Sequence, residues 1–178
     1  TLPEEVKGDA ALAIKDEYIF DFLELSAEHS ERELENALIG RIREFLCEMG
    51  GEFAFVGQQY RLLVSDKEYF IDILLFHRGL NALVALELKI DDFKPEYAGK
   101  MQFYLAALDD IVKKPHENPS IGIVMCRTRD DIIVEYALKN IHKPMSVNTY
   151  KVVKKLPKEY QGKLPQPEEI RKLLGKIK

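Results

Sequence analysis

Three ionisable residues interrupt an otherwise apolar stretch near the middle of the chain. The segment YFIDILLFHRGLNALVALELK (residues 69–89) carries Asp72, Glu87 and Lys89 among long runs of aliphatic and aromatic side chains. Two carboxylates beside an amine can share a proton, pair with the amine, or hold a hard divalent cation such as Mg²⁺, which prefers oxygen ligands. The residue types therefore point to acid–base or metal-assisted chemistry.

The apolar runs on either side of HRGLN predict two adjacent strands joined by a turn at Gly79. Strands this apolar lie in the middle of a sheet that is covered on both faces. If the hairpin turns between Gly79 and Leu80, Asp72 lies directly across from Glu87, and the side chains of both share one face with Lys89. A register shifted by one residue would separate them.

Two carboxylates facing each other in such a sheet need compensation. At a separation of roughly 5 Å and an effective dielectric near 20, their repulsion is roughly 3 kcal/mol before any cost of desolvation. A shared proton, the ammonium of Lys89 or a bound divalent ion would each offset it.

An acid on one strand and Glu-x-Lys on the next resemble the active-site signature of PD-(D/E)XK nucleases. The continuation of ELK into PEYAGKM and then YLAALDD is more specific, and from about Lys15 to Leu174 the chain is similar to the bacterial YhcG-type branch. The resemblance implies a restriction-endonuclease-like α/β fold, a mixed β-sheet with helices on both faces. Ile71 stands where the family signature has proline.

The resemblance also implies the chemistry, which is Mg²⁺- or Mn²⁺-dependent hydrolysis of DNA phosphodiesters in restriction, repair or recombination. Asp72 and Glu87 would hold the metal with the main-chain carbonyl of Leu88, and Lys89 would orient water or offset transition-state charge. Two alternatives stay open. One is a non-catalytic DNA-binding or scaffolding module on a nuclease fold. The other is a purely structural salt-bridge network of Glu87, Lys89 and Arg61.

One long helix is expected from Glu31 to Met49, with Ser30 and Glu33 as a capping box and a stop at Gly50. Its apolar stripe would cover the sheet. Glu35 lies beside that stripe. By the resemblance it reaches over the sheet as a catalytic residue near the metal; otherwise it is an exposed helix glutamate.

Strands are expected near residues 53–56 and 59–64. A two-residue loop at Asp66-Lys67 would set Arg61 opposite Asp72, with Gln59 on the same face. Both are candidate DNA contacts, although Arg61 could instead hold Asp72 in its ionised form.

A helix with Pro95 in its first turn follows the ELK strand. Lys100 and Tyr104 share one edge of it. By the resemblance these two residues contact the scissile DNA strand, and the alternative is a solvated lysine with a partly buried tyrosine. A strand at 121–126, parallel to the ELK strand, a helix near 130–140, a strand near 146–152 and a short helix from Glu168 complete the expected elements.

Charge is unevenly distributed along the 178 residues, whose net charge is −4. Residues 139–178 hold 11 lysines and arginines against 3 acidic residues. Such a basic region could grip phosphates or simply be a solvated surface. Residues 30–178 are expected to form one domain, and residues 1–29 a connecting arm, which by the resemblance follows another domain in a longer protein.

Cys47 and Cys126 lack CxxC spacing, which predicts small buried hydrophobic residues in a reduced, cytoplasmic protein. The four histidines have no ligand spacing, which argues against zinc. No signal peptide or membrane span is expected. The sequence leaves the oligomeric state open, although a homodimer would let a small domain act on both strands.

Overall fold

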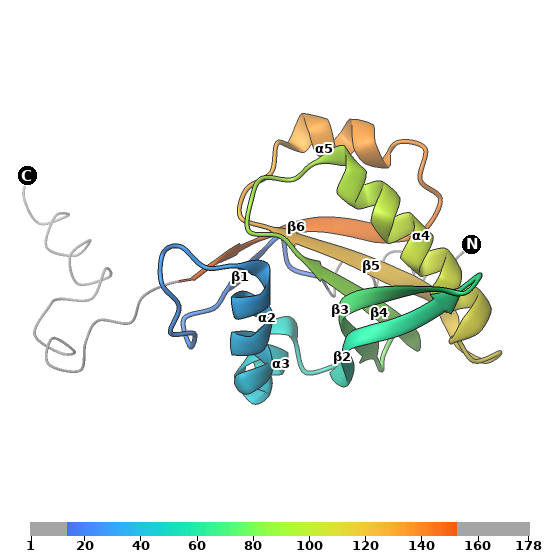
Figure 1. Cartoon of the computed structure of the whole chain (residues 1–178), viewed down its shortest axis with the longest axis horizontal. Helices are drawn as coiled ribbons and strands as arrows, with labels where there is room; N and C mark the ends of the chain where they lie inside the picture. Colours follow the sequence, from blue (N-terminus) through green and yellow to red (C-terminus); the bar gives the residue numbers. More distant parts are fainter. Residues whose placement is uncertain (1–13, 153–178) are drawn as a thin grey trace, which may run out of the picture.

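The computed structural model describes residues 14–152, which form a mixed six-stranded sheet with helices on both faces (Figure 1). The sheet order is β1-β6-β5-β4-β3-β2, which agrees with the predicted fold class. Its strands are β1 (Glu17–Ile19), β2 (Phe53–Val64), β3 (Lys67–His77), β4 (Ala82–Leu88), β5 (Asn118–Cys126) and β6 (Met145–Lys151). The helices are α2 (Glu31–Gly40), α3 (Ile42–Met49), α4 (Pro95–Ile111) and α5 (Asp131–Leu138).

The β3–β4 hairpin has the register that the sequence predicts. Ile73 pairs with Leu86 and Leu75 pairs with Val84, and every residue of β4 is buried. The ladder ends at the Ile73–Leu86 pair, so Asp72 and Glu87 come immediately beyond it. β4 and β5 run parallel, as expected for strands joined by a helical crossover.

The predicted register of the β2–β3 hairpin is wrong by two residues. Val64 pairs with Lys67, so the loop is Ser65-Asp66, and Arg61 pairs with Phe70 rather than facing Asp72. The two loop residues have φ values of 48° and 64°, the conformation that a tight two-residue hairpin turn requires. β2 is also one continuous strand with a register shift between Phe55 and Gly57, where two strands were expected.

The single long helix expected before the sheet is two helices, which divide at Arg41 with φ −122° and ψ 41°. Gly40, a weak helix former, precedes the break. The guanidinium of Arg41 pairs with Glu44 at 2.7 Å and donates to the carbonyl of Phe22. The capping box of Ser30 and Glu33 forms as predicted, which fixes where α2 starts.

Two apolar layers hold the helices to the sheet. Leu34 and Leu38 of α2 and Phe45 and Met49 of α3 pack on one face. The buried residues of α4 pack on the other face, and Met101 lies directly over Gly122 of β5. A β-carbon at position 122 would lie 2.5 Å from Cγ of Met101. This close approach fixes the height of α4 above the strands.

The segment predicted to be a connecting arm contributes one strand to the sheet and several side chains to its core. β1 pairs in parallel with β6, and Tyr18, Phe20, Phe22 and Leu23 are buried in the layer beside α2 and α3. The boundary expected at residue 30 therefore does not separate an arm from the fold. The attachment of a further domain stays a prediction.

Other expectations have mixed outcomes. Cys126 is buried as predicted, but Cys47 is exposed, because α3 turns that side of the helix toward solvent. Within residues 14–152 no helix is long and apolar enough to cross a membrane. The helix expected from Glu168 and most of the basic C-terminal region lie outside the described residues.

Candidate active site

Glu87 lies at the carboxyl end of β4 with only 2% of its surface exposed. Its Oε2 is 2.9 Å from Nζ of Lys100 on α4 and 3.8 Å from Nζ of Lys89. Its Oε1 is buried and has no hydrogen-bond partner within residues 14–152. Burial, reinforced by the negative charge of Asp72, raises the pKa of Glu87 to about 7. A cation close to Oε1 would favour the ionised form.

Asp72 is held across the end of the ladder. The backbone N–H of Leu88 donates to its Oδ2 at 2.9 Å, and Nε2 of Gln59 lies 3.3 Å from its Oδ1. The register puts Asp72 and Glu87 next to each other beyond the last ladder pair, and the hydrogen bond to Leu88 holds Asp72 there. The negative charge of Asp72 contributes to the raised pKa of Glu87.

Lys89 is the third residue of the candidate site. It lies close to Glu87, and only 8% of its surface is exposed. Its Nζ is 3.0 Å from Oε2 of Glu31 and 5.3 Å from the ring centre of Tyr97. Burial by itself lowers the pKa of Lys89, but the hydrogen bond that its ammonium donates to Glu31 and the charge of Glu87 outweigh this effect and raise the pKa. Lys89 is thus a fixed, charged ammonium.

Glu31 is a residue of this site that the sequence reasoning missed. It lies in the first turn of α2, four residues before Glu35, so both project from one face of the helix. That spacing was a signal that could have identified it, once Glu35 was placed over the sheet.

Glu35 is buried, with 3% of its surface exposed, so the alternative of an exposed helix glutamate is wrong. Nε2 of Gln58 donates to its Oε1 at 2.5 Å, and Nε2 of Gln59 donates to its Oε2 at 2.6 Å. Gln59, with φ at 46°, therefore links Glu35 to Asp72.

The residues predicted to contact DNA differ in exposure and in the partners of their side chains. Arg61 pairs with Glu68 at 2.6 Å and is mostly exposed, so the structural network of Arg61 with Glu87 and Lys89 is not formed. Tyr104 is buried, and its hydroxyl donates to the carbonyl of Phe70 at 2.9 Å. The side chain of Lys100 is 44% exposed. Lys100 is the one of these three that reaches both Glu87 and solvent.

The donor set fits a hard divalent cation held by few protein ligands. Within residues 14–152 no three His, Cys, Asp or Glu side chains lie close enough together to bind a metal. Asp72 and Glu87 would therefore need main-chain oxygen, which the Leu88 carbonyl could provide, and water. Mg²⁺ usually keeps several waters and takes one or two carboxylates. The unpartnered Oε1 of Glu87 is the observation that supports this fit.

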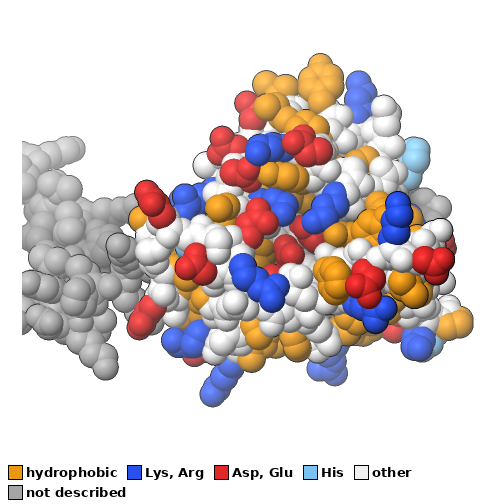
Figure 2. Space-filling view, in the orientation of Figure 1, with side chains coloured by type: hydrophobic (Ala, Val, Ile, Leu, Met, Phe, Trp, Pro, Cys, Tyr) orange, Lys and Arg blue, Asp and Glu red, His pale blue; other side chains and the backbone are white. Residues whose placement is uncertain are grey.

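Surface charge gives little further guidance. On the face seen in Figure 2, basic and acidic side chains are interspersed rather than gathered into one broad basic area.

Comparison with known proteins agrees with the geometry. Residues 11–165 match the family model of the YhcG PDDEXK nuclease domain. The chain is 39% identical over 147 residues to "Putative nuclease YhcG" of Escherichia coli (strain K12), covering 83% of this chain and 39% of that protein.

Two solved structures also align with it. A repair endonuclease from Pyrococcus abyssi matches with a TM-score of 0.46 and 15% identity, over 74% of this chain and 50% of that one. An EndoMS-dsDNA2 complex matches with a TM-score of 0.48 and 13% identity, over 78% and 50% of the respective chains.

Proposed function

The chain belongs to the YhcG PDDEXK nuclease domain family, and from that premise we propose that it hydrolyses phosphodiester bonds of DNA with Mg²⁺ or Mn²⁺. The observation that carries the proposal is the buried carboxylate of Glu87, which lies beside Asp72 and has one oxygen without a partner among the described residues. The chain spans about two fifths of the curated relative's length. The proposal therefore concerns the chemistry of this domain, and a further domain in the full-length protein is proposed on the same ground.

Asp72, Glu87 and the carbonyl of Leu88 would hold the metal. When bound, the ion would polarise the phosphate and lower the pKa of water. The hydrogen bonds from the N–H of Leu88 and the amide of Gln59 support this role, because they restrain the carboxylate of Asp72 through one contact to each oxygen.

Lys89 is proposed to donate a hydrogen bond to the attacking water or to a phosphoryl oxygen as negative charge accumulates there. Its ammonium is held by Glu31 and lies over the ring of Tyr97, so little rearrangement is needed. The raised pKa keeps it protonated at neutral pH.

Glu35 is proposed to act through Gln59 as a positioning residue. By accepting from the Gln59 amide at 2.6 Å it fixes the group that touches Asp72. Loss of the Glu35 carboxylate would make the side chain of Asp72 more mobile, but it would not remove a proposed metal ligand.

Among the proposed DNA contacts, Lys100 is best suited to a phosphate next to the scissile bond, because it is half-exposed and adjacent to Glu87. Arg61 and Gln59 would contact the backbone further along β2. Tyr104 would support this surface indirectly, through its hydrogen bond to Phe70.

Cleavage assays on plasmid, linear and branched DNA with Mn²⁺ test the proposal, comparing wild type with Lys89→Ala. We expect cleavage by wild type, inhibition by EDTA, and a loss of about 10²-fold or more in Lys89→Ala. Lys15→Ala, which removes a surface pair with Glu48, is the matched control and should cleave normally. Equal cleavage by wild type and Lys89→Ala would mean that a contaminant is responsible.

A non-catalytic DNA-binding role is the second candidate, favoured by the ion pair between Lys100 and Glu87, which already neutralises one oxygen of the site. Metal titration separates the two. Catalysis requires that Mg²⁺ or Mn²⁺ stabilise wild type against unfolding and that Asp72→Asn abolish the effect. If neither the added metal nor Asp72→Asn changes the stability against unfolding, the result supports the non-catalytic role.

A further inference from the structure

Two aromatic side chains meet at the surface where α4 crosses the start of β3. The ring centres of Phe103 on α4 and Tyr69 on β3 are 4.7 Å apart, at an interplanar angle of 56°. Phe103 is 38% exposed, and Tyr69 is partly buried beside it. Figure 2 shows hydrophobic side chains at the surface over α4 and the β2–β3 hairpin, among charged groups. Exposed apolar groups of this size are candidates for contact with a ligand.

Phe103 is linked to the candidate active site along α4. Its ring centre is 6.0 Å from that of Tyr104, and Nζ of Lys100 lies 5.2 Å from the Tyr104 ring centre. The same Nζ is 2.9 Å from Oε2 of Glu87. Lys100 and Phe103 are three residues apart, so they are neighbours on the surface of the helix. An exposed ring therefore follows the ammonium that adjoins the buried acid.

The aromatic pair is held in place by the fold. The hydroxyl of Tyr104 donates to the carbonyl of Phe70 at 2.9 Å, which ties α4 to the strand that carries Tyr69. Tyr69 pairs in the sheet with Leu62, which is buried in the layer beneath α4. Little freedom would be lost when a ligand packs on rings that are already fixed, and such pre-organisation favours binding.

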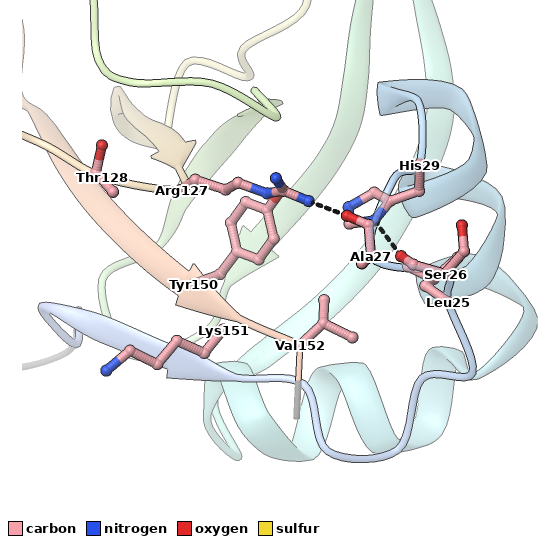
Figure 3. A pocket seen from close by; sticks show the side chains of 9 residues that line it. All are labelled: Leu25, Ser26, Ala27, His29, Arg127, Thr128, Tyr150, Lys151 and Val152. Carbon is pink, nitrogen blue, oxygen red and sulfur yellow. Dashed lines mark hydrogen bonds between the residues drawn. The ribbon is translucent and has the colours of Figure 1, made fainter. Parts of the chain in front are cut away.

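A cavity of about 510 Å³ elsewhere in the molecule is not part of this surface. It lies where the loop that precedes α2 meets the carboxyl ends of β5 and β6, and Figure 3 shows the side chains that line it. Leu25, Tyr150 and Val152 of its wall belong to the apolar layer beneath α2 and α3. Glu87 pairs with Lys100 of α4, so a strand bound at the acids would lie toward the opposite layer.

We propose that Phe103, supported by Tyr69, stacks on an unpaired base of the DNA strand whose phosphate meets Lys100. The inference rests on the proposed nuclease function. Aromatic side chains stack on all four bases, because every base has a π face, and a nearby cation holds the backbone. Both faces of a base inside a duplex are covered by its neighbours in the stack. The surface therefore favours DNA with unpaired nucleotides beside the scissile bond, such as a single strand or a single-stranded flap.

Fluorescence anisotropy of a short labelled single strand, and of the blunt duplex of the same sequence, tests the proposal with the full chain in EDTA. We expect Phe103→Ala to weaken binding of the single strand about tenfold, the range of one lost base stack, and to change binding of the duplex less than about twofold. Phe103→Leu keeps an apolar side chain against Tyr69 but removes the π face, so it should lose nearly as much.

Phe55→Ala is the matched control. Phe55 is 40% exposed, close to the value for Phe103, but it pairs with Leu75, which is buried in the layer beneath α2 and α3. This variant should bind both DNAs as wild type does. Phe103→Trp keeps an aromatic ring and should bind the single strand at least as tightly as wild type. Thermal melting checks that each variant is folded.

A direct readout of stacking comes from 2-aminopurine placed at one position after another along the single strand. We expect wild type to quench its emission at one or two positions, and Phe103→Leu to leave the emission there unquenched. Three results would each overturn the proposal: no binding of the single strand by wild type, equal losses on single strand and duplex in Phe103→Ala, or wild-type binding and quenching by Phe103→Leu.

The two proposals fail separately. Absence of Mn²⁺-dependent cleavage, together with a loss of single-strand binding specific to the Phe103 variants, would refute the nuclease function and keep the stacking surface. Cleavage that responds to Lys89→Ala, together with unchanged single-strand binding by Phe103→Ala and Phe103→Leu, would refute the stacking surface and keep the nuclease.

Discussion

The two ends of the β3–β4 hairpin each bury a titratable side chain, but they treat it differently. At the turn, Nδ1 of His77 accepts a hydrogen bond from the N–H of Leu80 at 3.1 Å, and the ring packs edge-on against Phe53. At the open end, one oxygen of Glu87 has no hydrogen-bond partner in the part of the chain that the structure describes. Burial disfavours the charged form of both groups, lowering the pKa of His77 and raising that of Glu87.

This comparison distinguishes a buried polar group that stabilises the fold from a buried polar group that is available to bind a ligand. His77 uses its polar atom within the turn, so the closed end is complete as it stands. Glu87 has a carboxylate beside it at Asp72 and a charge that the protein only partly neutralises. Substitutions at the open end should therefore remove activity and relieve instability, whereas substitutions at the closed end should remove stability alone.

Asp72→Asn gives the largest expected effect. Replacing the carboxylate by an amide removes a metal ligand while keeping the size of the side chain, so DNA cleavage should fall about 10³-fold. Initial rates of plasmid cleavage in Mn²⁺ measure this. A variant that keeps a tenth of wild-type activity would show that Asp72 is not at the reacting centre.

Glu87→Gln should stabilise the fold at alkaline pH. The unfolded chain ionises Glu87 near its ordinary pKa, whereas the folded chain holds the proton up to about pH 7. Wild type therefore loses stability as pH rises through this window, and the glutamine variant does not. The variant should be more stable by roughly 1–3 kcal/mol at pH 8 and nearly equal at pH 4.

Urea unfolding across that pH range measures the difference in unfolding free energy between Glu87→Gln and wild type. At pH 8, Mg²⁺ should reduce this difference, because it should stabilise wild type alone. If the stability of wild type and that of Glu87→Gln change in parallel from pH 4 to pH 8, the folded protein does not raise the pKa of Glu87, and the prediction is wrong.

His77→Leu tests the closed end. Removing Nδ1 leaves the N–H of Leu80 without its acceptor, which should cost about 1–2 kcal/mol of unfolding free energy. Cleavage per folded molecule, measured well below the melting temperature, should stay within about twofold of wild type. If His77→Leu loses most of its cleavage activity but keeps normal stability, the claim that the turn end of the hairpin serves stability alone is wrong.

Glu31→Gln gives the smallest expected effect. Lys89 would keep its position near Glu87 but lose the partner that raises its pKa, so cleavage should fall about fivefold. Since the ammonium would lose its proton at a lower pH, the alkaline limb of the pH–rate profile should move to lower pH. Glu96→Gln, an exposed change on α4, is the control and should leave that limb unchanged.

The sequence was informative where local rules decide the structure. The turn at Gly79 and the apolar runs around it determine the β3–β4 register, and hence the meeting of Asp72 and Glu87. The capping box determines the start of α2, and Pro95 the start of α4. In each case residues close together in the chain fix the outcome.

The sequence was not sufficient to predict contacts between segments that are far apart in the chain. Glu31 meets Lys89 across 58 residues, and β1 joins the sheet only because β6 offers an edge. The β2–β3 loop depends on which adjacent pair of residues adopts positive φ, and the sequence does not discriminate Ser65-Asp66 from Asp66-Lys67. Arg61 was therefore placed two residues from its true partner.

Gly122 has no functional group, yet it bears on the chemistry. Because Cγ and Sδ of Met101 occupy the space where a side chain would begin, even alanine there would force the Met101 side chain to move or α4 to shift. Lys100 is the neighbour of Met101, so a shift of the helix would carry its amine away from Glu87. Inactivating substitutions in this domain can thus arise at a position that touches neither the acids nor DNA, and a survey of variants limited to polar residues would overlook it.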